Sequence, residues 1–354
     1  MLFITIVFES QAIGRQIHWQ AKSLVLIQKG ATYARMIRLK NGDLLCVFEM
    51  DGKSWVKRSV DDGVRWGDRV LVASSPYGSD SNPSLIQLQN GSILLWYNFR
   101  PNDGIHSYEI SYNVSNNGGV TWTAGKTVWA GGITAKRGCW EPAAVQLPSG
   151  EIELFFSMEA PFGMEGEQGI ALERSYDEGK HWSHPDIISC NPGKRDGMPV
   201  PIISTSSGRI YVSIEANRET TNQLQPSVIW TTLTDDWHMG CIGRKNPFRI
   251  SRIVHPSLPD TVYAGAPYLC ELNQNTLILS CQIKEKHADS PRMMVYVADI
   301  KDMQFTNPSH PFYEGENPGC WWNSLFAKNQ DTVTAISNTS VNGVRGIWAI
   351  DGTL

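Results

Sequence analysis

The sequence predicts an all-β fold, a six-bladed β-propeller with four-stranded antiparallel blades. Two repeats predict it: a hairpin motif that occurs six times, and a turn motif ending in tryptophan that occurs three times in phase with it. Self-similarity at a period of roughly 40 to 60 residues is typical of propeller blades. All-β folds often exceed the usual domain size, so 354 residues fit one domain. We expect a single propeller over residues 20–354, preceded by an N-terminal extension or degenerate leader at residues 1–19.

Each hairpin has an apolar strand, a tight turn and a second β-rich strand. The hairpins lie at 38–48, 87–97, 146–156, 204–214, 271–281 and 327–337. The first four turns contain Asn-Gly or Ser-Gly, which favour hairpin turns, and the last two are degenerate. The turn residues are Gly42, Gly91, Gly150, Gly208, Asn275 and Asp331, at intervals of 49, 59, 58, 67 and 56 positions. Each interval is the length of one blade.

The second repeat reads S-x-[DN]-x-G-x-x-W at 59–66, 115–122 and 175–182, with a worn copy at 232–239. We expect its short polar side chains to accept hydrogen bonds from turn amides and its glycine to adopt a positive φ. Its tryptophan should pack between neighbouring sheets. These motifs are similar to Asp-boxes, and the chain resembles the sialidase-like propellers along nearly its whole length. The resemblance implies a closed ring with the boxes on its outer rim, remote from the active site.

Ring closure is expected between the two ends of the predicted propeller. The segment at 20–28 is suited to supply an outer strand for the last blade, whose IWAI sequence lies at 347–350. Closure removes the exposed sheet edges that promote aggregation.

Composition excludes several partner classes. The formal net charge is −4 and charged residues make up 19% of the chain, which argues against nucleic acid and anionic membranes. No apolar stretch reaches the roughly 18 residues that span a bilayer. The 13 tryptophans and 11 tyrosines suit both a core and contacts with sugar rings. We expect an oligosaccharide or polysaccharide partner, and the oligomeric state stays open.

Neither a disulfide framework nor a zinc site is indicated by the cysteines. They number seven, which is odd, and none forms a C-x-x-C pair. We interpret them as buried apolar residues and expect no metal or other cofactor. The first ten residues lack the basic region of a signal peptide. The compartment stays open, with secretion or the periplasm favoured over the cytoplasm.

Residues at equal offsets from the turns should surround one end of the channel. Nine positions before the turns lie Tyr33, Asn82, Glu141, Pro199, Ala266 and Trp322. Seven positions after the turns lie Glu49, Asn98, Ser157, Glu215, Gln282 and Asn338. Buried strand ends would normally be apolar. This polar set therefore predicts a water-filled cleft that binds hydroxyl groups.

Two carboxylates of this set lie on consecutive blades. Glu141 begins the inner strand of blade three, and Glu215 ends the second strand of blade four. Adjacent blades would bring both within reach of one glycosidic bond, as the carboxylates of glycosidases require. The structural alternative is that each is a solvated acid or the partner of a nearby arginine.

A comparison with sialidases, which use three arginines and a tyrosine nucleophile assisted by a glutamate, finds one match. Arg35 matches the first arginine. The second arginine position holds Glu215, with Arg218 close behind, and Trp322 and Asn323 replace the Tyr-Ser pair. Bidentate recognition of a carboxylate by arginine is hard to replace, so sialic acid is disfavoured.

The departures resemble glycoside hydrolase family 93, the exo-arabinanases. The similar blocks are Tyr33-Ala34-Arg35, Trp140-Glu141-Pro142, Gly197-Met198-Pro199 with its strand ending on Glu215, and Ala264-Gly265-Ala266-Pro267-Tyr268. The resemblance implies a retaining mechanism in which Glu141 is the acid/base and Glu215 the nucleophile. It also implies α-1,5-linked arabinan, cut from one end, as the substrate.

The remaining candidates are substrate-binding residues: Arg35, Tyr33, Asn82, Asn98, Asp196, Arg218, Tyr268, Trp322 and Asn323. Asp196 is either a third acid or a turn residue. Trp321, Trp322 and Tyr268 suit sugar stacking or blade packing. Arg35 could bind a substrate oxygen, or it could fix the position of Glu49 or Glu215.

Two alternatives remain. A sialidase with a rearranged arginine set would need Arg35, Arg218 and Arg292 to converge. A carbohydrate-binding propeller without catalysis would repeat its binding residues in every blade, whereas here the mouth residues differ from blade to blade.

Overall fold

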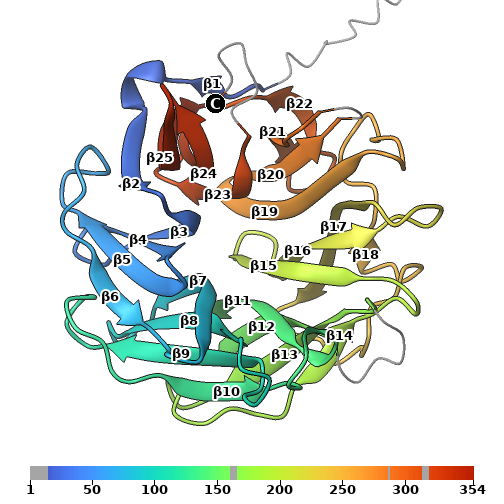
Figure 1. Cartoon of the computed structure of the whole chain (residues 1–354). Helices are drawn as coiled ribbons and strands as arrows, with labels where there is room; N and C mark the ends of the chain where they lie inside the picture. The colour runs from blue at the N-terminus through green and yellow to red at the C-terminus, as the bar shows by residue number, and fades with distance from the viewer. Residues whose placement is uncertain (1–14, 160–165, 286–287, 313–318) are drawn as a thin grey trace, which may run out of the picture.

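Six antiparallel sheets form a closed ring in the computed structural model, which describes residues 15–159, 166–285, 288–312 and 319–354. Figure 1 shows the sheets arranged radially around a central axis, with the first strand of each blade innermost. The predicted six-bladed propeller is confirmed. Residues 1–14 lie outside the described residues, and the domain boundary at residue 20 stays a prediction.

Each blade follows the chain from the axis outward. Blade one comprises β3 (Thr32–Arg38), β4 (Leu44–Met50), β5 (Lys53–Ser59) and β6 (Val70–Ala73). Blade two comprises β7 (Gly78–Gln87), β8 (Ile93–Pro101), β9 (Glu109–Ser115) and β10 (Lys126–Ala130). Blade three comprises β11 (Cys139–Gln146), β12 (Ile152–Met158), β13 (Gly169–Ser175) and β14 (Asp186–Ser189).

The second half of the ring repeats this order. Blade four comprises β15 (Asp196–Ser204), β16 (Arg209–Asn217), β17 (Leu224–Thr232) and β18 (Arg249–Ile250). Blade five comprises β19 (Tyr263–Asn273), β20 (Thr276–Lys284), β21 (Arg292–Asp299) and β22 (Thr306–Ser309). Blade six comprises β23 (Trp321–Ala327), β24 (Thr332–Val341) and β25 (Val344–Thr353), completed by strands from the N-terminal side.

The N-terminal segment closes the ring as the sequence predicts. Strand β2 (Val25–Lys29) pairs antiparallel with β25, with Val25 opposite Ala349. The short β1 (His18–Trp19) pairs with the far end of β25. The described part of the chain has only two 3₁₀ turns, η1 (Ala21–Ser23) and η2 (Ala135–Arg137), and neither is long enough to cross a membrane.

The apolar cores lie between neighbouring blades, because each sheet is covered on both faces. Strand β12 is buried along its whole length. Its Leu154 and Phe156 belong to one cluster with Trp96 and Tyr112 of blade two. This double burial explains why second strands such as β4 and β8 contain runs of consecutive apolar residues.

The predicted turn chemistry is confirmed at both repeats. Gly42, Gly91 and Gly150 have φ between 94° and 96°, a region that favours glycine. In the first tryptophan-ended motif, the Gly63 amide donates to Ser59 Oγ at 2.8 Å and the Arg65 amide donates to Asp61 Oδ1 at 2.9 Å. The other two copies repeat the serine bond, which joins Gly119 to Ser115 and Gly179 to Ser175 at 2.8 Å.

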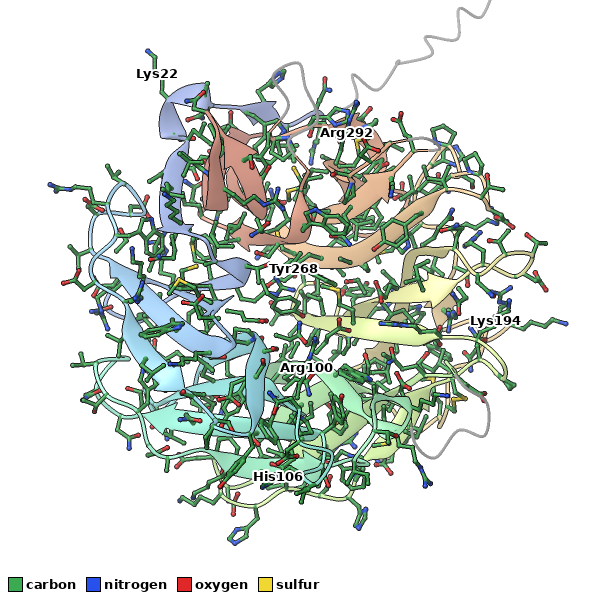
Figure 2. All side chains as sticks on the ribbon, viewed as in Figure 1. Lys22, Arg100, His106, Lys194, Tyr268 and Arg292 are labelled. Atoms are coloured by element: carbon green, nitrogen blue, oxygen red, sulfur yellow. A yellow bond between two sulfur atoms is a disulfide. The ribbon has the colours of Figure 1, made fainter. Side chains whose placement is uncertain are left out.

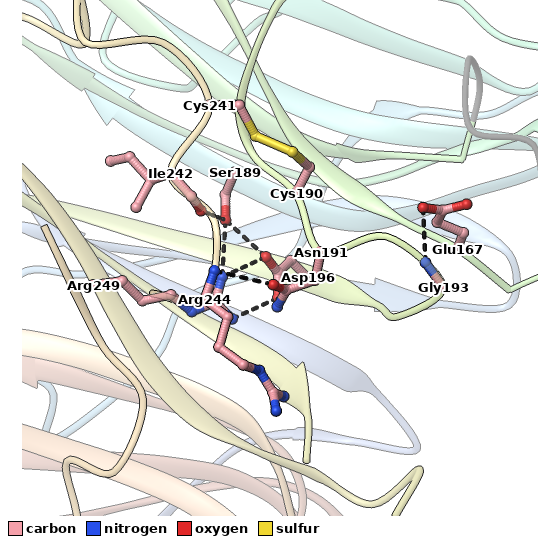
Figure 3. The surroundings of a disulfide bond; sticks show 10 residues. All are labelled: Glu167, Ser189, Cys190, Asn191, Gly193, Asp196, Cys241, Ile242, Arg244 and Arg249. Atoms are coloured by element: carbon pink, nitrogen blue, oxygen red, sulfur yellow. Dashed lines mark hydrogen bonds and ion pairs between the residues drawn. A yellow bond between two sulfur atoms is a disulfide. The ribbon is translucent and has the colours of Figure 1, made fainter. Parts of the chain in front are cut away.

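One interpretation of the cysteines was wrong. Cys190 and Cys241 form a disulfide, whereas Cys46, Cys139, Cys270, Cys281 and Cys320 are free and buried, as expected. Figure 3 shows the disulfide joining the end of blade three to a loop of blade four. Its partners are 51 positions apart in the sequence, and only the juxtaposition of the two blades brings them together.

Candidate active site

The inner strand of every blade contains the same β-bulge. Each ladder skips two residues there, and the first of them has a positive φ between 47° and 57°. These residues are Tyr33, Asn82, Glu141, Met198, Ala266 and Trp322. Bulges re-aim side chains, and a non-glycine residue at positive φ costs roughly 1–3 kcal/mol. The ring predicted by counting from the turns is confirmed in five blades and is wrong in blade four.

Blade four deviates because its strand is longer. Its ladder continues from Ser204 to Arg209 across four residues, whereas blade three leaves five between Gln146 and Ile152. Counting back nine positions from the turn therefore stops at Pro199, one residue short of the bulge at Met198.

The bulges do not line a wholly polar cleft. Tyr33, Met198 and Ala266 pack together with Trp322 as an apolar cluster. The rings of Tyr33 and Trp322 lie 5.8 Å apart. The polar character of the mouth therefore comes from the other two bulge residues and from the second strands, and the seven polar residues predicted for the cleft are Glu49, Asn82, Asn98, Glu141, Glu215, Gln282 and Asn338.

The polar residues at the ends of the second strands hold the next blade in place. Ser157 accepts the amide of Met198 at 2.8 Å, Glu215 accepts that of Ala266 at 3.0 Å, and Gln282 accepts that of Trp322 at 3.0 Å. Glu49 accepts the Asn82 amide at 3.3 Å. Asn98 and Asn338 instead donate to carbonyls at the same junctions, those of Cys139 and Ala31. We call these six residues the junction ring.

Glu141 is the one bulge residue with a carboxyl group. It is 6% exposed, and its Oε2 atom has no hydrogen-bond partner. Burial and, secondly, the nearby charge of Glu215 raise the pKa of Glu141 from its usual value to about 7, against the opposing effect of Arg195. A carboxyl with this pKa can donate a proton near neutral pH.

Glu215 has a different environment. Its Oε2 accepts the Ala266 amide, and its Oε1 lies 2.8 Å from the guanidinium of Arg195. A backbone amide and a guanidinium thus each donate to one of its oxygens. Sequence reasoning missed Arg195, although it lies three positions before the bulge of the same blade. The two acids that sequence analysis paired thus differ in their contacts: Glu141 Oε2 has no hydrogen-bond partner, whereas both oxygens of Glu215 have one.

Arg35 lies over the aromatic residues at the axis. Its guanidinium carbon is 4.0 Å from the centre of the Tyr33 ring and 5.0 Å from that of Tyr268. It donates to the carbonyls of Ala34 and Trp322 at 2.8 and 3.3 Å, and its second terminal nitrogen is buried without a partner. It therefore does not hold Glu49 or Glu215.

A second arginine that sequence analysis missed completes the mouth. Arg100 donates to the side chains of Asn82 and Asn98 and lies 5.1 Å from the ring centre of Trp140. Arg100, Arg35 and Arg195 all act to lower the pKa of Glu141. Figure 2 shows Arg100 and Tyr268 near the axis. The sequence offered one signal for Arg100, which is its position two residues after Asn98.

Three predicted binding residues are buried. Asp196 is fully buried and forms two bonds with Arg249 at 2.6 and 2.7 Å (Figure 3). Arg218 is 6% exposed and pairs with Asp260 at 3.2 Å. Asn323 is fully buried in β23. Ion pairs engage Asp196 and Arg218, and the interpretation of these two as binding residues is corrected. The side-chain nitrogen and oxygen of Asn323 are buried without a hydrogen-bond partner, and its binding role stays a prediction.

Comparison with known proteins supports the fold. A family model described as a BNR repeat-like domain matches residues 101–262. The predicted resemblance to the sialidase-like propellers is thereby confirmed, and a comparison with curated protein sequences finds no match.

Solved structures share the whole ring. A protein of unknown function from Dyadobacter fermentans is 13% identical, with a TM-score of 0.72, over 94% of this chain and 98% of that one. An α-L-arabinanase from Penicillium chrysogenum, complexed with arabinobiose, is 18% identical, with a TM-score of 0.69, over 96% and 98%. A sialidase from Streptococcus pneumoniae is 10% identical, with a TM-score of 0.61, over 96% and 70%. At these identities the similarity shows the fold.

Proposed function

We propose that this protein is a retaining glycoside hydrolase that removes units from the end of α-1,5-linked arabinan. The observation that carries the proposal is the contrast between Glu141 and Glu215. The pKa of the Glu141 carboxyl is raised to about 7, and the Glu215 carboxyl forms an ion pair with Arg195 at 2.8 Å. Glycosidases need two carboxyl groups whose environments separate their protonation states.

The two residues would act in sequence. Glu141 gives its proton to the leaving oxygen while a Glu215 oxygen attacks the anomeric carbon, so that the glycosidic C–O bond breaks and a glycosyl ester forms. Glu141, now a carboxylate, takes a proton from water. The hydroxyl then attacks the anomeric carbon and releases Glu215. We assign contacts with substrate hydroxyls to Arg35, Arg100 and Tyr33, because the charges of both arginines act on Glu141 and the charge of Glu141 acts on Tyr33.

The arabinan assignment has narrower support. It rests on the motif blocks around Glu141 and Glu215 and on the similarity to a Penicillium chrysogenum arabinanase that was complexed with arabinobiose. The mouth differs in every blade, which favours one asymmetric site over the repeated sites of a carbohydrate-binding propeller.

The test is hydrolysis of linear α-1,5-arabinan by the wild type, Glu141→Gln and Glu215→Gln, with product anomers followed by NMR. We expect release of short products with retained configuration, abolished by both substitutions. Inverted products would reject the roles of the two acids. An inactive wild type that still binds arabino-oligosaccharides would favour a binding protein.

A substrate bearing a carboxylate is the second candidate. It is favoured by the arginines around Glu141, although they are not the set that a rearranged sialidase was expected to use. Arg218 is paired with Asp260, and Figure 2 shows Arg292 far from the axis. Arg35 and Arg195 each retain a buried nitrogen without a hydrogen-bond partner. Cleavage of a sialyl or glucuronyl reporter, with none of arabinan, would select this candidate.

We also propose that the protein acts outside the cytoplasm. The Cys190–Cys241 disulfide supports this, because disulfides persist mainly in oxidising compartments. Titration of the unfolded, unreduced chain should find five thiols, the number of free cysteines. Seven thiols in protein isolated without reductant would contradict the proposal.

A further inference from the structure

A cavity between blades one and two lies apart from the candidate active site. It measures about 460 Å³, within the range of small-molecule sites. Its lining comes from the segment that leaves blade one and from β7, β8, β9 and the β9–β10 connection. In Figure 2 its lining residue His106 lies near the outer edge of the ring, away from Arg100 and Tyr268 at the axis.

The cavity presents hydrogen-bond acceptors and no basic partner for them. Asp80 is 3% exposed, and its carboxylate accepts the backbone amide of Ser75. Glu109 also lines the cavity, and no lysine or arginine is among the lining residues. His106, which bonds to Asp103, stacks on Tyr77 with ring centres 4.4 Å apart. Anionic ligands are therefore disfavoured.

Asn113 adds an acceptor whose orientation is fixed. Its side-chain nitrogen donates to the carbonyls of Val72 and Thr123 at 2.9 and 2.7 Å. A flipped amide would place oxygen against two carbonyls, so Oδ1 must be the other atom. Asn113 is 2% exposed, and its Oδ1 has no hydrogen-bond partner. Buried acceptors without donors are costly, and a ligand that donates hydrogen bonds would relieve that cost.

We call the space beside Asp80 the niche. Blade four has an equivalent space, and an arginine side chain fills it. Asp80 and Asp196 occupy the same position, two residues before the bulge, where the other four blades have alanine or cysteine. Asp196 is neutralised by the guanidinium of Arg249. Around it lie Ser189 and Asn191, from the segment leaving blade three. The equivalent segment of blade one lines the cavity beside Asp80.

Blade two lacks the residue that fills the niche in blade four. Arg249 precedes Ile250, which pairs with Val228. In blade two, Lys126 occupies the place of Ile250, and its partner Tyr112 occupies the place of Val228. Gly125, which precedes Lys126, therefore takes the place of Arg249. Gly125 lines the cavity, and a Cβ atom there would meet the Tyr97 hydroxyl. Blade four has Ile214 at the position of Tyr97.

We propose that the cavity beside Asp80 binds a small organic cation carrying a guanidinium or primary ammonium group. The cation takes the place that Arg249 holds in blade four, donating to Asp80 and Asn113 Oδ1. Tyr97 and Phe99 supply aromatic surface of the kind that favours cations. The inference is independent of the proposed hydrolase activity.

Binding of agmatine, measured by calorimetry in amine-free phosphate buffer, tests the proposal. Agmatine is the probe because it carries both cationic groups. We expect Asp80→Asn to weaken its binding at least tenfold, and the matched control Glu178→Gln, an exposed acid outside the cavity, to leave it unchanged. Xylitol, which is neutral, should not bind there. Equal binding by Asp80→Asn, or no wild-type binding at millimolar agmatine, would overturn the proposal.

A second variant tests the proposal independently, in case Asp80→Asn does not fold. Tyr97→Ile with Gly125→Arg reproduces the pair found in blade four, so the new arginine should neutralise Asp80. We expect a raised Tm and loss of agmatine binding. Retained binding in this double variant would also overturn the proposal. The natural occupant could also be an arginine side chain of a partner protein. In that case an arginine-containing peptide should bind more tightly than agmatine, and its binding should depend on the same residues of the cavity.

Affinity should also depend on pH. Burial raises the pKa of Asp80 to about 7, and a cation favours its ionised form. The other titratable groups facing it are Tyr97, Tyr77, Glu109 and His106, of which His106 alone can become a cation. Agmatine should therefore bind more tightly at pH 8 than at pH 6, and tighter binding at pH 6 would contradict the assignment.

Discussion

Ser157 and Glu215 occupy the same place in consecutive blades and make the same bond. Each accepts the amide of the bulge residue in the next blade, at 2.8 and 3.0 Å. A serine hydroxyl suffices in blade three, and the amide of Gln282 suffices in blade five. A carboxylate also makes this bond in blade one, where Glu49 accepts the Asn82 amide. Glu215 differs from the other members of the junction ring by its ion pair with Arg195 and by its charge, which raises the pKa of Glu141.

Replacement of Glu215 by glutamine separates the two roles and should have the largest effect. The amide oxygen can still accept the Ala266 amide, as Gln282 does for Trp322, but the nucleophile is lost. We expect kcat on arabinan to fall at least about 10³-fold, while the free energy of unfolding changes by about 1–2 kcal/mol because Arg195 loses its partner.

Glu49→Gln is the matched control, because Glu49 holds the same place in blade one. It should fold and hydrolyse arabinan like the wild type. An equal loss of activity in both variants would show that Glu215 acts through the junction alone. Kinetics and chemical denaturation of the two variants side by side give the answer.

Replacement of Glu141 by glutamine should have the next largest effect. It removes the proton donor, and loss of general acid catalysis typically costs about 10²–10⁴-fold. An aryl arabinoside with a good leaving group needs less protonation, so its hydrolysis should fall less than that of arabinan. Equal losses on both substrates would argue against Glu141 as the acid.

The activity should depend on pH through Glu141. Its raised pKa keeps it protonated below pH 7 or so, and hydrolysis should fall as pH rises through that value. Arg195 lowers this pKa, so Arg195→Ala should move the alkaline limb upward by about one unit. A downward shift in the pH profile of kcat/KM would place the acid elsewhere.

Ser157→Ala tests the junction where no charge is present and should have the smallest effect on rate. It leaves the Met198 amide without its partner, which should lower the free energy of unfolding by about 1–3 kcal/mol. Urea denaturation measures this, and Ser157→Thr, which keeps the hydroxyl, is the control. An unchanged free energy in Ser157→Ala would show that the bond contributes nothing to the junction.

The hairpins could be read from the sequence because each depends on residues a few positions apart. Turn dipeptides in four repeats and β-rich strands in all six predicted the hairpins. The same register predicted that Glu141 and Glu215 lie at the same end of their blades, and the apolar segment at 20–28 predicted the ring closure. The offset of nine positions before the turn failed in blade four, where it gives Pro199. One extra ladder position in that blade moves the bulge to Met198.

The partners of charged groups were not readable in this way. Asp196 immediately follows Arg195 in the sequence, yet the two side chains do different things. Arg195 pairs with Glu215 at the mouth, and Asp196 pairs with Arg249, 53 positions away. Neighbours in a strand point to opposite faces, and no local pattern indicates which blade each face will meet.

The sequence by itself determined the number of blades, the closure of the ring and the register that places Glu141 beside the axis, because strand and turn preferences are local. Only the tertiary structure decided the protonation of Glu141, the partner of Glu215, the Cys190–Cys241 disulfide and the open niche beside Asp80. Burial and charge pairing depend on distances between blades, and those distances exist only when the ring is closed.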